Sequence, residues 1–346
     1  MRTYLLIILV VLLVSPVFAA QPPRELTILN WDDYLDPELV TRFERENNAK
    51  VSQVLYATDE DRTRKLLETG GRGYDLILTS GIDLAKYIKN GWLKPLDTAR
   101  LKNRRHLSSQ WLTAFPDAEQ YALPYFWGTL GIAYRTDLVK TPITRWSQIF
   151  TPAQELHQKI GMIDDSRDIV SMALKALGFS ANSEDKEALA QVKTLLRQQK
   201  PHVKSYRYVA IDETSALLSG EMVAAMMYNG DALAVAEFNE NITYVLPEEG
   251  GNIWVDYFVL SHAARNPDLA YAFLDFINNP PVAAQQAEYV YFATPNAAAE
   301  KLLDPEFLEH PAIYPSVKAL KQSEYYQPIS PRGNRLRNIM SSEILR

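Results

Sequence analysis

The sequence predicts an α/β protein divided into two lobes. Segments typical of strands alternate with segments typical of helices, which favours mostly parallel strands covered by helices. The chain has 346 residues, which is long for one hydrophobic core, so two cores are expected. It contains no cysteine, which excludes disulfide bonds, thiol catalysis and cysteine-bound metals.

The first twenty residues have the features of a cleavable export signal. Arg2 gives a positive start, residues 5–14 form an unbroken apolar run, and Ala19-Ala20 offers a small-residue cleavage site. The run is shorter than the roughly 20 residues that span a bilayer. We therefore expect residues 1–20 to be removed and the rest of the chain to be free in the periplasm.

The predicted strands and helices begin shortly after residue 20. Apolar and β-branched residues predict strands, and amphipathic spacing predicts helices. Strands are expected at 25–30, 50–56, 74–78, 159–163 and 222–227, and helices at 37–47, 61–68 and 82–89. A basic segment that begins with Pro328 and Pro331 is expected to end the chain as a helix packed on one lobe.

Two segments are candidates for crossings between the lobes. Residues 121–134 form an aromatic, strand-like run interrupted by proline and glycine, and residues 246–254 contain the pair Gly250-Gly251. Glycine and proline at these places suit a hinge or a sharp redirection, and equally an ordinary turn.

Aromatic and acidic residues gather at the ends of the predicted strands, where ligands of parallel sheets bind. The strand at 25–30 leads into Trp31-Asp32-Asp33-Tyr34, and Trp254-Val255-Asp256 begins a later strand with the same pairing of indole and carboxylate. Aromatic faces and carboxylates both attract cations. Together they predict a site for an organic ammonium ion.

Each of these residues also has a purely structural interpretation. Trp31 and Tyr34 could be packing aromatics, and Asp33 could belong to the turn that enters the next helix. Asp165, with Asp168 three residues later, fits the capped start of a helix, and on local evidence this interpretation is the stronger one. The roles are compatible, because a capping carboxylate can present its second oxygen to a ligand.

Other chemistries are disfavoured. The chain has no nucleophile elbow and no P-loop, and its five histidines lack metal-ligand spacing. Asp164 and Asp165 are adjacent, which does not suit the paired carboxylates of glycoside cleavage. Tyr325-Tyr326 is a weak signal for ferric iron, and adjacent tyrosines are more often packing residues. The net charge of −6 disfavours nucleic acid and suits a cationic ligand.

Seven short motifs occur in one order along the chain. They are Asn-Trp-x-x-Tyr at 30–34, Tyr-Asp-Leu at 74–76 with Ser80, Leu-Pro-Tyr-x-Trp-Gly at 123–128, Asp-Asp-x-Arg-Asp at 164–168, Asn-Gly at 229–230, Glu-Gly-Gly-x-x-Trp-x-Asp at 249–256 and Thr-Pro-Asn at 294–296. Over about residues 25–327 the chain thereby resembles the periplasmic polyamine-binding proteins of ATP-driven spermidine/putrescine importers.

The resemblance implies the two-lobed α/β periplasmic binding protein fold of type II, with hinge segments between the lobes. It implies a first lobe of residues 21–130 and 255–300 and a second lobe of residues 131–254 and 301–346.

The resemblance also implies a site between the lobes, in which aromatic walls hold a methylene chain and carboxylates hold its amines. The matching residues are Trp31, Tyr34, Tyr228 and Trp254 for the walls and Asp165, Asp168 and Asp256 for the amines. Ser80 matches a hydroxyl of the pocket and Gln327 an amide of the pocket, while Asp32 falls beside the pocket.

Four positions depart from the family pattern. Tyr228 stands where tryptophan is common and Asp168 where glutamate is usual, while Ile82 and Phe292 occupy places that are often tyrosine. The last two changes remove hydroxyl groups and leave apolar surface. They leave the length and identity of the amine open, but not its cationic class.

The function implied is capture of a putrescine- or spermidine-like polyamine and its delivery to an ABC importer, without catalysis, metal or cofactor. The partners would be the polyamine and an inner-membrane permease, served by a monomer in the periplasm. One alternative is a polyamine sensor that docks a membrane signalling protein, such as a cyclic-di-GMP enzyme. A second is an exported hydrolase, disfavoured by the missing nucleophile and metal motifs.

Overall fold

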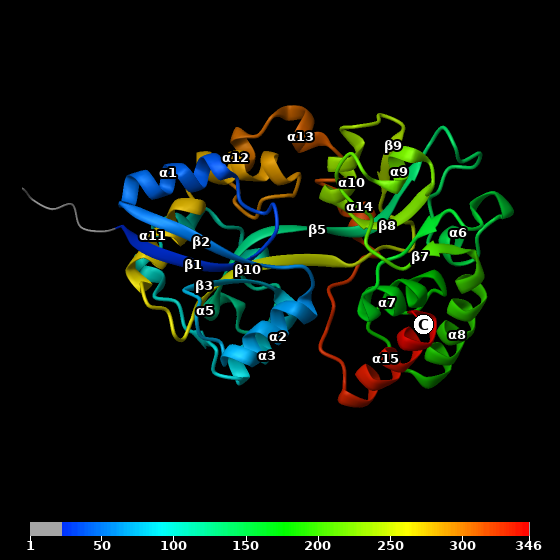
Figure 1. Cartoon of the computed structure of the whole chain (residues 1–346), viewed down its shortest axis with the longest axis horizontal. Helices are drawn as coiled ribbons and strands as arrows, with labels where there is room; N and C mark the ends of the chain where they lie inside the picture. Colours follow the sequence, from blue (N-terminus) through cyan, green and yellow to red (C-terminus); the bar gives the residue numbers. More distant parts are fainter. Residues whose placement is uncertain (1–22, 346) are drawn as a thin grey trace, which may run out of the picture.

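The computed structural model describes residues 23–345, which form two lobes side by side (Figure 1). The export signal predicted for residues 1–20 lies outside the described residues. In Figure 1 the first lobe is on the left and the second, which holds the red C-terminal helix, is on the right. Within 23–345 no helix is long and apolar enough to cross a membrane.

The chain first builds most of the first lobe. Its elements are β1 (Arg24–Trp31), α1 (Pro37–Asn47), β2 (Ala49–Tyr56), α2 (Asp59–Thr69), β3 (Leu76–Ser80), α3 (Leu84–Lys89), β4 (Leu93–Lys94), α4 (Ser109–Leu112), α5 (Ala118–Tyr121) and β5 (Ala122–Arg135). Helix α1 begins at Pro37 because the preceding carboxylate of Asp36 accepts the backbone N–H of Glu38 at 2.8 Å.

The second lobe is built next, by shorter strands and longer helices. Its elements are α6 (Ser147–Phe150), β6 (Ile160–Gly161), α7 (Ser166–Ala176), α8 (Lys186–Gln199), β7 (Val203–Ser205), α9 (Ala216–Ser219), β8 (Ala224–Tyr228), α10 (Asn229–Ala236) and β9 (Ile242–Val245).

The chain then returns to the first lobe and finishes on the second. The returning elements are β10 (Ile253–Ser261), α11 (Pro267–Ile277), α12 (Pro280–Val290), α13 (Pro305–Glu309), α14 (Val317–Leu320) and α15 (Pro331–Leu345). The predicted terminal helix is therefore present, and it packs against α7 and α8 of the second lobe.

The strands form one mixed sheet in the order β2-β1-β3-β10-β5-β8-β6-β7, with β4 beside β10 and β9 beside β5. Pairing is parallel between β1 and its neighbours and between β6 and its neighbours. Strands β5 and β10 are antiparallel to every strand beside them. The expectation of mostly parallel strands was wrong at the centre of the sheet. There the chain leaves the first lobe along β5 and returns to it along β10, so these two strands run antiparallel.

Strand β5 is the longest crossing between the lobes. As far as Thr129 it pairs with β10, and from Leu130 it pairs with β8 and β9. Gly128 does not form a turn, since it lies inside the continuous strand. A Cβ there would lie 2.5 Å from the Trp254 ring and 2.2 Å from Oδ1 of Asn229. This glycine allows close packing where the lobes meet.

The second lobe was expected to resume at residue 301, but the residues that follow pack on the first lobe. Leu303 and Ile313 are buried in the apolar clusters of the first lobe, and the Tyr314 ring packs edge-on against Trp127 there. The chain enters the core of the second lobe only at Tyr326. We therefore use "first lobe" for residues 24–129 and 253–325 and "second lobe" for residues 130–252 and 326–345.

Residues 322–327 form a further crossing, which the sequence did not predict. The backbone N–H of Ile253 donates to the carbonyl of Glu324 at 2.9 Å, and the N–H of Glu324 donates to the carbonyl of Gly251 at 3.0 Å. Gly250, with φ of 81°, lies so close that a Cβ would meet the Gln322 backbone at 2.2 Å. The segment that enters β10 and the crossing at residues 322–327 are thus held against each other.

Candidate functional site

Several of the predicted aromatic and acidic side chains meet where the two lobes face each other. They come from the loop after β1, from β10 and the loop after α12 in the first lobe, and from β8 and α7 in the second. In spatial order, the continuous row of contacts consists of Asp256, Tyr34, Phe292, Trp254, Tyr228 and Asp168.

The first lobe supplies the larger part of this row. The Tyr34 hydroxyl donates to Oδ2 of Asp256 at 3.1 Å. The rings of Tyr34 and Trp254 both stand against Phe292, with centroids 5.8 Å and 4.8 Å away. The indole nitrogen of Trp254 is buried without a hydrogen-bond partner among the described residues, so it is a free donor beside these rings.

The second lobe touches the first at this row. The Tyr228 ring lies edge-on to Trp254 with centroids 6.1 Å apart. Next to it, a Cβ on Gly230 would lie 2.4 Å from the ring of Phe292. The Asn-Gly pair that begins α10 therefore permits contact between the lobes, because no larger residue fits at Gly230 without movement.

Asp256 is a buried carboxylate that forms no ion pair within the described chain. It is 8% exposed, and its one side-chain hydrogen bond comes from Tyr34. None of the ion pairs of residues 23–345 includes it. Burial raises the pKa of Asp256 to about 7, and repulsion from Asp59 adds to the shift.

Asp168 is the corresponding carboxylate of the second lobe. It lies in the first turn of α7 and is 2% exposed. Two phenols donate to it, Tyr228 to Oδ2 at 2.9 Å and Tyr326 to Oδ1 at 2.6 Å. Burial, followed by repulsion from Asp165, raises the pKa of Asp168 to about 7.

Asp165 caps helix α7, as one of its two interpretations predicted. Its Oδ1 accepts the backbone N–H groups of Arg167 at 2.7 Å and Asp168 at 3.1 Å. Burial raises its pKa above the ordinary range. Within the described chain Oδ2 accepts no hydrogen bond, so this oxygen can still serve a ligand.

Three further predicted residues, Trp31, Ser80 and Ile82, are half-buried. Ser80 stands opposite Asp256 in the pairing of β3 with β10. The Trp31 ring packs on Tyr56 with centroids 4.5 Å apart. Ile82 is half-buried and packs against the apolar clusters of both lobes.

Two predicted residues are exposed instead. Asp32 accepts the backbone N–H of Asp33 at 3.1 Å, and Asp33 has the left-handed φ of 49° that suits its predicted place in a turn. Gln327 uses its backbone N–H to bind the side chain of Asn182 at 2.8 Å. In this arrangement of the lobes neither side chain joins the row.

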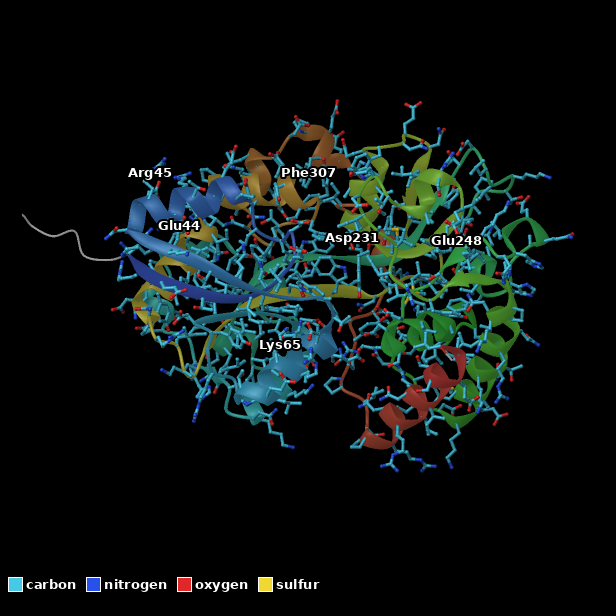
Figure 2. The ribbon with its side chains drawn as sticks, in the orientation of Figure 1. Glu44, Arg45, Lys65, Asp231, Glu248 and Phe307 are labelled. Carbon is cyan, nitrogen blue, oxygen red and sulfur yellow. The ribbon has the colours of Figure 1, made fainter. Side chains whose placement is uncertain are left out.

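The sequence reasoning missed Asp231 and Tyr208. Figure 2 shows Asp231 on the side of the second lobe that faces the first. Tyr208 donates to Asp231, accepts the backbone N–H of Tyr228 at 3.2 Å and stacks on the Tyr228 ring at 6.0 Å. Burial raises the pKa of Asp231 to about 6. Asp231 directly follows the Asn-Gly motif at 229–230, whereas Tyr208 lies in a loop without any sequence signal.

A second group of buried charges adjoins the site and is neutralised internally. Arg62 is 0% exposed and pairs with Asp59 at 2.7 Å and Asp83 at 2.6 Å. Asp59 also meets Arg167 at 3.5 Å. Asp59–Arg167 joins the first lobe to the second, as does Lys175–Glu324 at 2.9 Å, whose glutamate lies on the crossing at 322–327.

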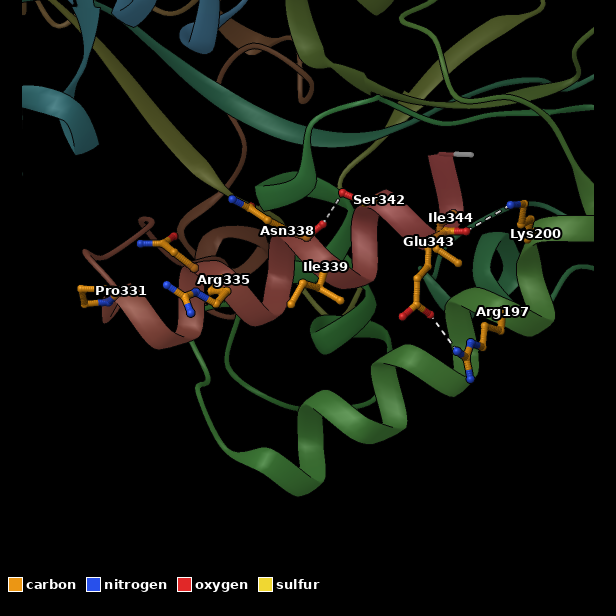
Figure 3. A pocket seen from close by; sticks show the side chains of 10 residues that line it. Arg197, Lys200, Pro331, Arg335, Asn338, Ile339, Ser342, Glu343 and Ile344 are labelled. Atoms are coloured by element: carbon orange, nitrogen blue, oxygen red, sulfur yellow. Dashed lines mark hydrogen bonds and ion pairs between the residues drawn. The ribbon is translucent and has the colours of Figure 1, made fainter.

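A surface hollow lies away from this site, between α8 and α15 (Figure 3). Glu343 pairs there with Arg197 at 2.7 Å, and Lys200 donates to its carbonyl at 3.2 Å. None of the predicted site residues lines this hollow. Residues 23–345 contain no group of three or more histidine or acidic side chains placed to hold a metal ion.

A family model described as bacterial extracellular solute-binding protein matches residues 38–315. The chain is 30% identical over 312 residues to the spermidine/putrescine-binding periplasmic protein of Escherichia coli, covering 90% of this chain and 88% of the relative. It is 29% identical over 321 residues to the norspermidine sensor of Vibrio cholerae, covering 92% and 88%.

The fold is similar to that of a solved structure, a putative spermidine/putrescine ABC transporter from Listeria monocytogenes. The TM-score is 0.84 at 34% sequence identity, over 93% of this chain and 98% of the other.

Proposed function

Because this chain belongs to the bacterial extracellular solute-binding protein family, which is non-enzymatic, we propose that it captures a polyamine between its lobes. The observation that carries the proposal is the pair Asp168 and Asp256. Each carboxylate is buried, each is hydrogen-bonded by phenols, and neither forms an ion pair within the described chain. A buried carboxylate without a counter-charge is costly, so both sites favour a cationic ligand.

The two carboxylates stand on opposite lobes and are joined by aromatic rings. A polyamine carries separated ammonium groups on a flexible methylene chain, which matches this sequence of acid, rings and acid. Each ammonium would be held by a carboxylate, and the methylenes would lie against Trp254, Tyr228 and Phe292. A desolvated cation–π contact contributes about 2 kcal/mol.

The ligand would also hold the lobes together. Only an arrangement with both lobes in contact places Asp168 and Asp256 on one ligand, so binding favours the closed form over an open one. The crossings in β5, β10 and residues 322–327 are the segments about which such a hinge would move.

We assign ligand contact to the row itself and to Asp165, with Trp31, Ser80 and Ile82 at its edge. Asp231 is added as a third carboxylate of the second lobe, since it lies one turn from Tyr228 and is bonded only by a phenol. Asp32 and Gln327 are assigned at most a peripheral role, because both are exposed.

The first test is isothermal titration calorimetry with putrescine, cadaverine, spermidine, norspermidine and spermine. At least one of them should bind, and Asp168→Asn should weaken that amine by at least about tenfold, since the variant leaves an ammonium without its carboxylate. The names of the relatives support this panel. If none of the five amines binds, the proposal is wrong.

The receiving partner is proposed to be an inner-membrane ABC permease, reached by the monomeric protein in the periplasm after removal of its signal. The relative that acts as a norspermidine sensor favours one alternative, docking to a membrane signalling protein. Uptake of a radiolabelled amine by cells that lack this protein separates the two. Lost uptake supports transport, whereas unchanged uptake supports sensing.

A further inference from the structure

The adjacent residues Tyr325 and Tyr326 belong to different lobes. The Tyr325 ring packs edge-on against Phe115 of the first lobe, with centroids 5.7 Å apart. Tyr326 is 6% exposed in the core of the second lobe. Its hydroxyl reaches Oδ1 of Asp168 at 2.6 Å, a residue 158 positions earlier in the chain.

The place of Tyr326 is fixed by the crossing segment that carries it. Glu324, two residues earlier, accepts Nζ of Lys175 at 2.9 Å, and its backbone pairs with Gly251 and Ile253. The carbonyl of Tyr325 accepts the side-chain amide of Asn182 at 2.9 Å. These bonds to three separate parts of the fold hold the phenol where α7 presents Asp168.

We propose that Tyr326 is a positioning residue of the ligand site, which together with Tyr228 holds the Asp168 carboxylate between two phenols and keeps it ionised for the ammonium ion. This inference rests on the proposed function, because it concerns the same carboxylate. A carboxylate can accept about four hydrogen bonds. Each carboxylate oxygen of Asp168 accepts one hydrogen bond from a phenol, and its remaining acceptor positions are left for the ligand.

The groups that face Asp168 have opposite effects on the pKa of its carboxyl group. On α7, Asp165 disfavours its negative charge and Arg167 favours it. From the other elements, the hydroxyls of Tyr228 and Tyr326 both favour the charged form by donating to it, and Tyr208 stacks behind Tyr228. Since burial already raises the pKa of Asp168 to about 7, loss of one donor should raise it further.

The decisive variant is Tyr326→Phe, which keeps the ring and removes only the hydroxyl. The matched control is Tyr325→Phe, which removes the neighbouring hydroxyl on the first-lobe side. Carbon-13 NMR of aspartate-labelled, ligand-free protein gives the pKa of Asp168, with its signal identified by its absence in Asp168→Asn. We expect the pKa to rise in Tyr326→Phe and to stay unchanged in Tyr325→Phe.

Calorimetry of the same variants against pH gives the second readout. An ammonium binds the ionised carboxylate, so affinity falls as the pH falls through the pKa of Asp168. We expect Tyr326→Phe to bind within about threefold of the unaltered protein near pH 9 and roughly tenfold more weakly near pH 6.5. A loss of equal size at every pH would indicate a merely structural role and overturn the inference.

The two proposals fail in different ways. If the unaltered protein binds no polyamine, the proposed function is wrong, and the NMR titration still decides whether Tyr326 controls Asp168. If the amine binds but the pKa of Asp168 does not rise in Tyr326→Phe, the inference is wrong and the function stands.

Discussion

Two groups of acids lie close together between the lobes, and they have different partners. Asp59 and Asp83 share the fully buried guanidinium of Arg62. Asp168 and Asp256 are bonded by phenols. Burial alone would raise the pKa of Asp59, but Arg62 and Arg167 hold it below its ordinary range. The pKa values of Asp168 and Asp256 are raised to about 7.

This difference separates a structural charge cluster from a ligand site. A carboxylate with its own arginine is balanced within the fold and needs nothing further. A carboxylate that receives only phenols forms no ion pair within the described chain, and an external cation can supply the missing partner. Burial of an acid is therefore less informative about function than the identity of the groups that face it.

The largest expected effect is on stability, from Arg62→Met. The variant removes the buried cation that Asp59 and Asp83 share, which should lower the free energy of unfolding by about 3–5 kcal/mol. Urea denaturation measures the change. Arg64→Met is the matched control, because Arg64 lies on the same helix with an exposed side chain and should change stability by about 0.5 kcal/mol or less. Equal effects of the two variants would contradict the distinction between the clusters.

The next largest effect is on binding, from Asp256→Asn. Affinity for the polyamine should fall by well over tenfold, because a buried ammonium loses its charged partner. The free energy of unfolding without ligand should not fall, since the variant removes an unbalanced buried charge. Calorimetry and urea denaturation measure the two quantities. Asp32→Asn, an exposed carboxylate next to the same tyrosine, should leave the affinity unchanged.

The pH dependence should differ between the ligand-free and the ligand-bound protein. The raised pKa values of Asp168 and Asp256 keep both groups protonated in the native state where the unfolded chain has lost the protons. Their contribution to stability is therefore fully present below the ordinary aspartate pKa and is lost as the pH rises through about 7.

The affinity should change in the opposite direction. An ammonium binds the ionised carboxylates, so affinity should rise by roughly tenfold or more from about pH 6 to pH 8. Thermal unfolding with and without ligand over this pH range checks both the fall in stability and the rise in affinity. A ligand-induced gain in melting temperature that is constant with pH would show that neither carboxylate titrates in the site.

The smallest expected effect is that of Arg167→Gln, which removes one of the ion pairs between the lobes. Asp59–Arg167 is separated by 3.5 Å and partly exposed, and such pairs contribute about 0–1 kcal/mol. Arg167→Gln should therefore accelerate ligand dissociation by no more than about fivefold at neutral pH. Stopped-flow measurement of dissociation checks this, and a much larger change would place Arg167 in direct contact with the ligand.

Local features of the sequence predicted much of the fold. The alternation of strands and helices, the last helix and the two-lobed class are confirmed by the structure and by its likeness to the solved relatives. The family is confirmed as well. The assigned ligand contacts stay predictions, although the structure places Tyr34, Tyr228, Trp254, Phe292 and the two acids in one row.

What the sequence by itself determined was the kind of residue at each strand end, because strand and helix patterns depend on neighbours a few positions apart. Only the tertiary structure decided which acids have a cation of their own. The bond between Tyr34 and Asp256 spans 222 positions and that between Tyr326 and Asp168 spans 158. No local pattern records such partners, because the chain crosses to the other lobe and back between the two members of each pair.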